Sequence, residues 1–148
     1  MEIQFLGAAR TITGSMHRVK ANGKQFLLDC GTYEGPRTQS RDRNVLTAFF
    51  DPAKIDFVIL SHAHIDHCGN LPSLVKQGFR GHIFSTPATM DLCSVILSNN
   101  AISLERDCEY LNRKRSQQDP LHEPLYQLQD IGETLKRFVC ISTDFVKL

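Results

Sequence analysis

Four side chains of metal-binding type follow a short apolar run near the middle of the chain. Residues 57–60 read Phe-Val-Ile-Leu, and the next seven read Ser-His-Ala-His-Ile-Asp-His, which groups His62, His64, Asp66 and His67. The unbroken apolar run predicts a strand in the centre of its sheet. Imidazole and carboxylate groups are ligands for zinc and related divalent ions. Four of them at a strand end would leave polar groups unpaired unless an ion satisfies them, so this interpretation is favoured over a solvated histidine-rich loop.

The spacing within the cluster suggests how two ions would be shared. Side chains alternate along an extended segment, so His62 and His64 should point to the same side and hold one ion together. Asp66 and His67 lie past the strand, where the chain must turn, and can face a second ion. Paired metals about 3.5–4 Å apart recur in hydrolytic sites. Gly69 is expected to let the backbone bend into the following helix.

Length and composition describe an ordinary globular domain. The 148 residues suffice for one domain with a real core, and they are 41% hydrophobic and 22% charged. The net charge of +1 excludes a global basic field but leaves room for a local nucleic-acid patch. No run reaches membrane-spanning length, and the N-terminus lacks a signal-peptide pattern. Five scattered cysteines without a CxxC pair indicate free thiols, hence a cytoplasmic protein, or a nuclear one in a eukaryote.

Local patterns predict strands and helices in a mixed order. Asn22-Gly23 is a strong hairpin signal between two short strands. Thr86-Pro87 opens the longest helix, with Thr86 as its N-cap. The expected strands are 2–6, 16–20, 24–28, 55–60, 82–84 and 138–141; the expected helices are 71 to about 78, 87–112 and 130–137, with a loop over 31–44 that runs into a short helix. The apolar face of the long helix is expected to comprise Leu92, Val95, Ile96, Ile102 and Leu111. Strands with interspersed helices predict an α/β layered domain, and the hairpin indicates a mixed sheet.

The cluster and several other stretches resemble a known superfamily. Residues 61–67 are similar to the HxHxDH motif of the metallo-β-lactamase superfamily. Further stretches resemble its RNA-processing branch, which contains the β-CASP nucleases. They are Thr13-Gly14-Ser15, Leu27-Leu28-Asp29-Cys30-Gly31, Gly69-Asn70-Leu71-Pro72, Gly78-Phe79-Arg80-Gly81, Thr86-Pro87-Ala88-Thr89 and Glu123-Pro124-Leu125-Tyr126. The resemblance runs from about residue 2 to residue 126.

This resemblance implies an αββα sandwich with a two-zinc site. By carry-over, His62 and His64 would bind the first zinc, and Asp66 and His67 the second. Asp29 matches an early family aspartate that holds the site by hydrogen bonds, so Asp29 and Asp66 are the candidate catalytic residues. The alternative roles are a turn residue for Asp29 and a helix N-cap for Asp66.

The chain departs from the family in its later part. The family has three further ligands, two histidines and a bridging aspartate, and the only histidines after the cluster are His82 and His122, both expected to face solvent. Residues 1–148 are therefore expected to form a partial metallo-β-lactamase domain, the N-terminal half, without the C-terminal half and the β-CASP insert. We expect at most one tightly bound zinc, because two would face a single carboxylate. We also expect an exposed apolar face that favours marginal stability or self-association.

Three functions are compatible with these patterns. The first is a zinc-dependent ribonuclease that cleaves RNA phosphodiester bonds with a metal-activated hydroxide. The second is a metallo-hydrolase acting on a thioester or lactam, and the third is an inactive binding or assembly fragment. RNA is thus the expected partner, and no membrane association is expected. Arg113, Lys114 and Arg115 could contact a phosphate backbone, although cations at a helix end also interact favourably with the helix dipole.

Overall fold

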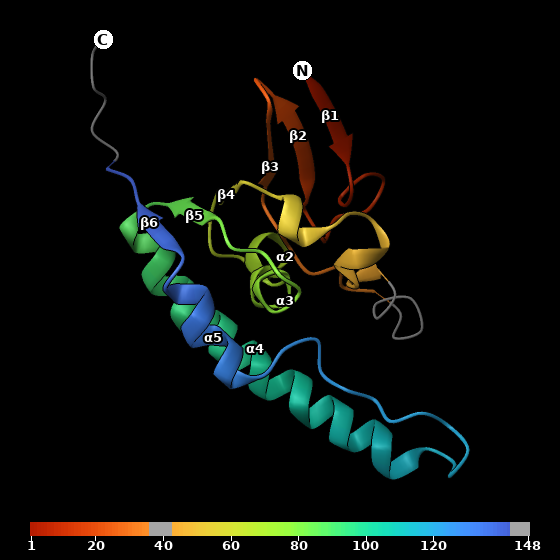
Figure 1. The fold of residues 1–148 in the computed structure, drawn as a ribbon. Helices are drawn as coiled ribbons and strands as arrows, with labels where there is room; N and C mark the ends of the chain where they lie inside the picture. The colour runs from red at the N-terminus through yellow and green to blue at the C-terminus, as the bar shows by residue number, and fades with distance from the viewer. Residues whose placement is uncertain (36–42, 143–148) are drawn as a thin grey trace.

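One six-stranded sheet forms the centre of the molecule. The computed structural model describes residues 1–35 and 43–142, and its strands follow one another across the sheet in chain order (Figure 1). β1 (Glu2–Phe5), β2 (His17–Ala21) and β3 (Lys24–Leu28) are antiparallel neighbours. β4 (Phe57–Ile59), β5 (His82–Ser85) and β6 (Phe138–Cys140) then continue parallel to β3. The predicted mixed sheet with flanking helices is confirmed, and β4 is central as expected.

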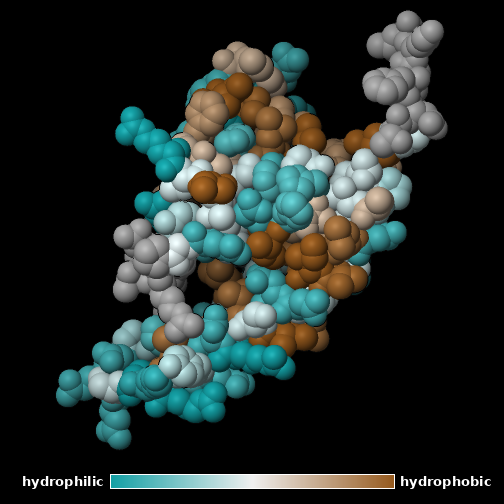
Figure 2. All heavy atoms as spheres, turned by 180° about the vertical axis from the view of Figure 1, so that it is seen from behind, coloured by the Kyte–Doolittle hydropathy of each residue, from teal (hydrophilic) through white to brown (hydrophobic). Residues whose placement is uncertain are grey.

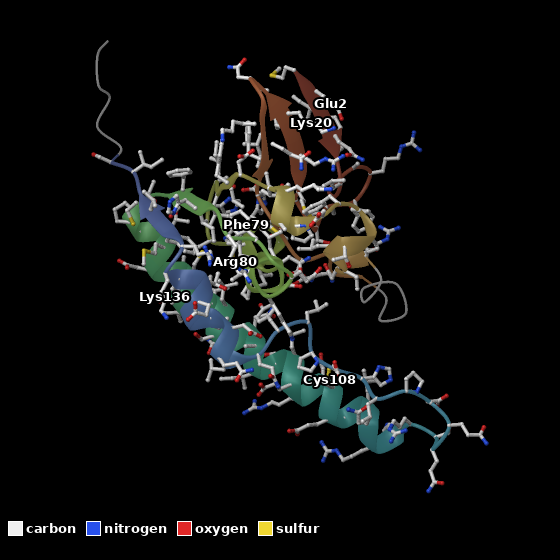
Figure 3. The ribbon with its side chains drawn as sticks, in the orientation of Figure 1. Glu2, Lys20, Phe79, Arg80, Cys108 and Lys136 are labelled. Carbon is white, nitrogen blue, oxygen red and sulfur yellow. The ribbon has the colours of Figure 1, made fainter. Side chains whose placement is uncertain are left out.

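The β2–β3 hairpin has the turn that its sequence predicts. Asn22 and Gly23 have φ angles of 50° and 74°, the left-handed values that a two-residue type I′ turn requires at both positions. Lys20 on β2 also forms a 3.3 Å ion pair with Glu2 on β1, and both side chains are labelled at the outer end of the sheet in Figure 3. Local turn chemistry therefore fixes the register of this half of the sheet.

Helices supply the core on one face of the sheet. They are α2 (Ile65–Cys68), α3 (Leu71–Lys76), α4 (Pro87–Lys114) and α5 (Leu128–Leu135), with the 3-10 turns η1 (Leu46–Ala48) and η2 (Pro52–Lys54). Leu27, Val58 and Ile83 lie in register on β3, β4 and β5, and all three are fully buried in the core. α5 contacts α3 and α4, and α2 contacts α4. Of the two short helices after β4, α2 therefore lies against α4 and α3 lies against α5.

The opposite face of the sheet is apolar and partly open. Phe26 and Phe57 stack there with ring centroids 4.6 Å apart, in register across β3 and β4. Phe5 is 66% exposed and Ile59 is 41% exposed. Seen from behind, apolar side chains gather over the upper part of the molecule, where the strands lie (Figure 2). The expected exposed apolar face is therefore present among the described residues.

The predicted apolar face of the long helix is wrong for most of its members. α4 begins after Thr86, whose hydroxyl accepts a hydrogen bond from the Thr89 amide, as predicted. Its fully buried residues are Cys93, Leu97 and Ala101, each one turn after the last, with Ile96 and Leu104 packed beside them. Leu92, Val95 and Ile102 are 50%, 56% and 38% exposed. The small side chains at 93 and 101 let α4 approach the core closely, so the buried stripe follows steric fit rather than the largest apolar residues.

The remaining expectations for the elements hold closely. Helices and strands lie within a few residues of the predicted ranges, while the expected short helix over 31–44 falls partly outside the described residues. All five cysteines are free. In the described part of the chain, no helix combines the length and the apolar character that a membrane crossing requires.

Candidate metal centre

The site lies at the carboxyl ends of β3 and β4. Because these strands are parallel and Leu28 pairs with Ile59, Asp29 and Ser61 emerge side by side. The backbone amide of Asp29 donates to the Ile59 carbonyl at 3.0 Å, which continues the ladder one residue past the strands. The chain then stays extended through His64 and enters α2, which carries Asp66 and His67. Parallel pairing thus places an aspartate from one segment against a histidine-rich turn 32 or more residues later.

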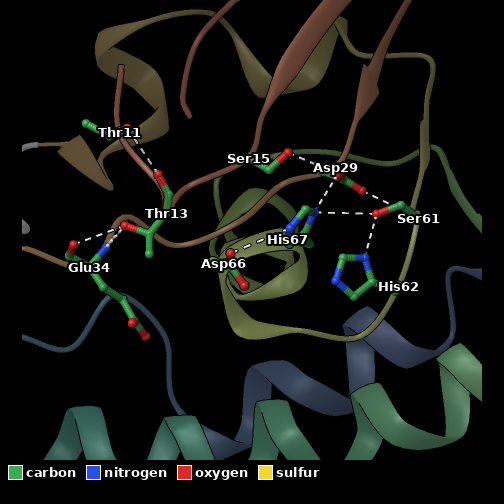
Figure 4. A network of polar contacts seen from close by, with 9 residues as sticks. All are labelled: Thr11, Thr13, Ser15, Asp29, Glu34, Ser61, His62, Asp66 and His67. Atoms are coloured by element: carbon green, nitrogen blue, oxygen red, sulfur yellow. Dashed lines mark hydrogen bonds and ion pairs between the residues drawn. The ribbon is translucent and has the colours of Figure 1, made fainter. Parts of the chain in front are cut away.

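Asp29 is the best-connected polar group of the site. Its carboxylate accepts hydrogen bonds from the Ser61 amide at 2.9 Å and from the Ser15 hydroxyl at 3.0 Å, and Nδ1 of His67 lies 2.8 Å from Oδ2 (Figure 4). Burial alone would raise the pKa of Asp29, but the hydrogen bonds from Ser61, His67 and Ser15 outweigh burial and hold that pKa below its ordinary value. Asp29 therefore stays a carboxylate that fixes the orientation of the His67 ring.

The three histidine rings are neighbours. The ring centroid of His62 lies 4.6 Å from that of His64 and 4.1 Å from that of His67. The Ser61 hydroxyl contacts Nδ1 of His62 at 2.9 Å. His64 is exposed, whereas His62 and His67 are half-buried. The Nδ1 atoms of His62 and His67 are thus engaged by protein groups, which leaves Nε2 of each ring for another partner.

Asp66 and His67 face each other from consecutive positions of α2. Oδ2 of Asp66 lies 3.5 Å from Nε2 of His67, the nitrogen that Asp29 does not engage. Two ligands at about 2.0–2.1 Å from a tetrahedral zinc would be roughly 3.4 Å apart. The observed separation therefore fits a pair of ligands on one ion.

Backbone hydrogen bonds hold α2 in place. The amides of Ser15, Cys30 and Thr32 donate to the carbonyls of Asp66, His67 and Ile65 at 2.7, 2.8 and 3.1 Å. The bonds to Asp66 and His67 satisfy carbonyls that a four-residue helix cannot satisfy internally, while the Ile65 carbonyl also accepts from the Gly69 amide at 2.8 Å. The position of the turn that carries Asp66 and His67 is thus set by two segments from the N-terminal half of the sheet.

Two glycines allow this close packing. A Cβ on Gly31 would lie 1.6 Å from the Asp66 carbonyl oxygen, so only glycine fits there. The expectation for Gly69 is wrong in its reason. Gly69 has an ordinary helical backbone, with φ −64° and ψ −20°, and a Cβ there would meet the Thr32 hydroxyl at 2.1 Å and the Ile65 carbonyl at 2.4 Å. Space, rather than a sharp bend, requires glycine at position 69.

The donor set suits zinc in its chemistry. Within residues 1–35 and 43–142, no three His, Cys, Asp or Glu side chains form a group that could hold an ion. The structure brings the His62 ring beside both His64 and His67, and it brings Asp66 beside His67. The neighbouring Cys30 is fully buried, and burial together with the charge of Asp29 raises the pKa of its thiol, so it is not a ready ligand. The assignment of the four side chains as metal ligands stays a prediction.

Outside the predicted cluster, two serines contact the site, and the two later histidines do not. Ser15 and Ser61 contact Asp29, and the sequence patterns gave them no such role; the only signal was their place in the Thr13-Gly14-Ser15 and Ser61–His67 stretches. His82 is exposed, as expected. His122 is half-buried instead, with its backbone amide and carbonyl both hydrogen-bonded to the Asn112 side chain. Neither histidine adds a donor to the site.

Comparison with known proteins agrees with this geometry. The family model described as the metallo-β-lactamase superfamily matches residues 12–82, which cover β2 to the start of β5 and include Asp29 and all four clustered side chains. This chain belongs to the metallo-β-lactamase superfamily. The match ends at the first residue of β5, the strand that follows the cluster, so it covers the part of the fold that builds the site.

Curated relatives of this metallo-β-lactamase chain are RNA-processing proteins. A ribonuclease of Thermus thermophilus is 43% identical over 99 residues, which are 67% of this chain and 22% of that protein. Cleavage and polyadenylation specificity factor 73 of Drosophila melanogaster is 34% identical over 67% of this chain and 14% of its own length. Transcription termination factor FttA of Methanocaldococcus jannaschii is 28% identical over 95% of this chain and 20% of its own length. The resemblance to the RNA-processing branch is confirmed, and the chain spans about a fifth or less of the length of these relatives.

Among solved structures, human tRNase Z, short form, aligns with a TM-score of 0.46 and 21% identity. The alignment covers 68% of this chain and 40% of that chain.

Proposed function

We propose that this chain supplies the ligand-bearing part of a zinc-dependent ribonuclease that cleaves RNA phosphodiester bonds. The observation that carries the proposal is the contact between Asp29 and His67, which directs Nε2 of His67 towards Asp66. A carboxylate behind a histidine is the arrangement by which proteins orient metal-binding imidazoles. The relatives named above supply the substrate class.

Each residue of the cluster has a distinct part in this proposal. His62 and His64 would hold one zinc and Asp66 and His67 a second, as the family motif implies; the 3.5 Å separation of Asp66 and His67 supports the second pair. Asp29 would not touch the metal; it would keep His67 in the tautomer with the proton on Nδ1. Ser61 would do the same for His62 through its 2.9 Å contact with Nδ1.

Bound zinc would supply a hydroxide near neutral pH and stabilise the charge that develops on the phosphate oxygens. The protein's own contribution is orientation. Three backbone amides hold α2, Asp29 holds the His67 ring, and Asp66 is the candidate to position the attacking group from its place beside Nε2 of His67. The rigid placement of these groups lowers the entropy that must be lost when substrate and nucleophile meet.

We further propose that this chain binds at most one zinc tightly. Two zinc ions carry four positive charges, and Asp66 is the one carboxylate among the proposed ligands. An uncompensated charge in a partly buried site is costly. The pairs of donors seen here, rather than groups of three, are in keeping with that limit.

Two other functions are outcomes of the same test. A thioester or lactam hydrolase would use the same four side chains on a different substrate. A binding or assembly role without catalysis is favoured by one observation, the absence of a three-ligand group among the described residues. The ribonuclease proposal is preferred because the cluster is intact and its supporting contacts are in place.

The deciding experiment measures zinc-dependent cleavage of a labelled single-stranded RNA. We expect cleavage that a chelator stops, and His64→Ala should slow it by at least about a hundredfold, because the change removes a ligand rather than a supporting group. His82→Ala is the matched control, since His82 is exposed and lies outside the site. Hydrolysis of a thioester or lactam in place of RNA would assign the second function, and zinc binding without any hydrolysis would assign the third.

A further inference from the structure

The far half of α4 presents an exposed cationic stripe that the proposed metal centre does not use. Arg106, Tyr110, Arg113 and Lys114 lie four, three and one residues apart, so they share one face of the helix. All four side chains are exposed. This end of α4 extends away from the sheet, and Cys108, labelled in Figure 3, marks it. We call these four residues the α4 cationic stripe.

The cationic side chains of the stripe make few hydrogen bonds or ion pairs that would stabilise the fold. Neither Arg106 nor Arg113 forms a hydrogen bond or an ion pair with another residue in the described ranges. Lys114 donates to the Tyr110 hydroxyl at 2.5 Å, and its Nζ lies 4.5 Å from the centroid of that ring. Arg115 differs, because it donates to the carbonyls of Ser116 and Asp119 and closes the turn after the helix. The structure thus separates Arg115 from its two cationic neighbours.

A favourable interaction with the helix dipole explains only part of the stripe. Arg113 and Lys114 lie in the last turn of α4, where cations stabilise a helix. Arg106 lies two turns earlier, beyond the reach of that effect, and Tyr110 is an aromatic ring left 43% exposed. Glu109 borders the stripe and offsets one charge. Cations that flank an exposed aromatic ring suit a single-stranded nucleic acid, whose phosphates meet the cations while a base stacks on the ring.

The distance from the site sets the length of RNA that could reach both. α2 contacts α4, and Cys68 of α2 and Cys93 in the first half of α4 belong to the same buried core. Arg113 follows Cys93 by 20 residues, which is about 30 Å of helix. Arg106, at the near end of the stripe, follows Cys93 by 13 residues, or about 20 Å of helix. A stacked strand advances roughly 3.4 Å per nucleotide, so about six nucleotides would reach Arg106 and about nine would reach Arg113.

We propose that the α4 cationic stripe is a second contact site for single-stranded RNA, one that engages the strand about six to nine nucleotides from the metal centre. This inference rests on the proposed ribonuclease function for the identity of the ligand. It predicts that long RNA binds more tightly than short RNA, and that the difference depends on the stripe.

The test compares binding of fluorescent RNA oligonucleotides of 5 and 20 nucleotides by anisotropy. The variant Arg106→Gln/Arg113→Gln/Lys114→Gln should weaken binding of the 20-mer by at least about tenfold. It should also reduce the slope of log affinity against log salt by about 2, since each phosphate contact on a single strand contributes about 0.7. Binding of the 5-mer should not change. The control Lys20→Gln/Lys24→Gln/Lys136→Gln removes the same charge at exposed positions elsewhere and should have little effect.

Three results would overturn the proposal. Equal losses in both variants would indicate a general charge effect, and an unchanged 20-mer affinity would leave the stripe without an RNA role. Loss of binding to phosphatidylserine vesicles with RNA binding intact would assign the stripe to a membrane surface instead. The His64→Ala variant separates this proposal from the catalytic one, because it should lose cleavage while the stripe substitutions, added to it, still weaken binding of the 20-mer by at least about tenfold.

Discussion

The Oδ2 atom of Asp29 lies 2.8 Å from Nδ1 of His67, which joins two residues 38 positions apart in the chain. Asp29 directly follows β3, and His67 lies on the short helix that follows the neighbouring parallel strand. The contact leaves Nε2 of His67 facing Asp66. The residue after one strand therefore orients the His67 ring, which lies on the helix after the next strand.

Asp29→Asn should weaken zinc binding by about 10–100-fold while the chain stays folded. An amide cannot replace the negative charge that favours the Nδ1–H tautomer of His67, and outer partners of metal-binding histidines contribute about this much. Isothermal titration with zinc measures the change. Asp91→Asn, at an exposed position on α4, is the matched control. Equal affinities for the two variants would show that Asp29 does not support the site.

Gly31→Ala should destabilise the chain by about 2–3 kcal/mol, because the added methyl group would overlap the Asp66 carbonyl and force α2 to move. Gly132→Ala is the control, since a Cβ there meets nothing within 4 Å and should stabilise α5 by about 0.5–1 kcal/mol. Urea unfolding gives both values. A Gly31→Ala chain with unchanged stability and unchanged zinc binding would contradict the role of this close approach.

Acid should remove a stabilising contact between β3 and the start of β4. The Gln25 amide and Lys24 hold the pKa of Asp56 below its ordinary value of 3.8. Because the folded-state pKa is lowered, the contribution is present above that ordinary value and is lost as the pH falls through the folded value. The difference in urea midpoint between the wild type and Asp56→Asn should therefore exist at pH 6 and shrink below about pH 4. A difference that is the same at both pH values would rule out this linkage.

The open apolar face of the sheet should drive association between two copies of the chain. Sedimentation velocity should show a concentration-dependent dimer that Phe5→Ser/Ile59→Ser reduces, because both residues are exposed on the face that helices do not cover. Ile12→Ser is the control, since Ile12 is 94% exposed in the β1–β2 connection. A wild-type chain that stays monomeric and melts cooperatively would count against this expectation.

Local signals were enough to predict most elements of the fold. The Asn22-Gly23 turn, the apolar run before the cluster and the Thr86-Pro87 helix start each act through neighbouring residues, and each prediction is confirmed. The buried stripe of α4 was not predictable in the same way. It depends on which side chains are small enough to let the helix approach the core, as Cys93 and Ala101 show.

In the candidate site, too, the residue types were predictable from local sequence, and the contacts between distant residues were not. The four clustered side chains and Asp29 were found from their types, their spacing and a family resemblance. Which atoms meet was not, because the contacts of Asp29 with Ser15 and His67 and the need for glycine at position 31 arise from long-range packing. The candidate residues were thus predictable from the sequence, whereas their hydrogen-bond partners depend on the strand register.

The central claim, that the clustered imidazoles and Asp66 bind zinc, is tested most directly by isothermal titration of zinc into the metal-free chain. We expect one tight site per chain, which Asp66→Asn and His67→Ala each remove and His82→Ala leaves intact. Heat consistent with two equally tight ions, or affinity that survives both substitutions in the cluster, would contradict the claim.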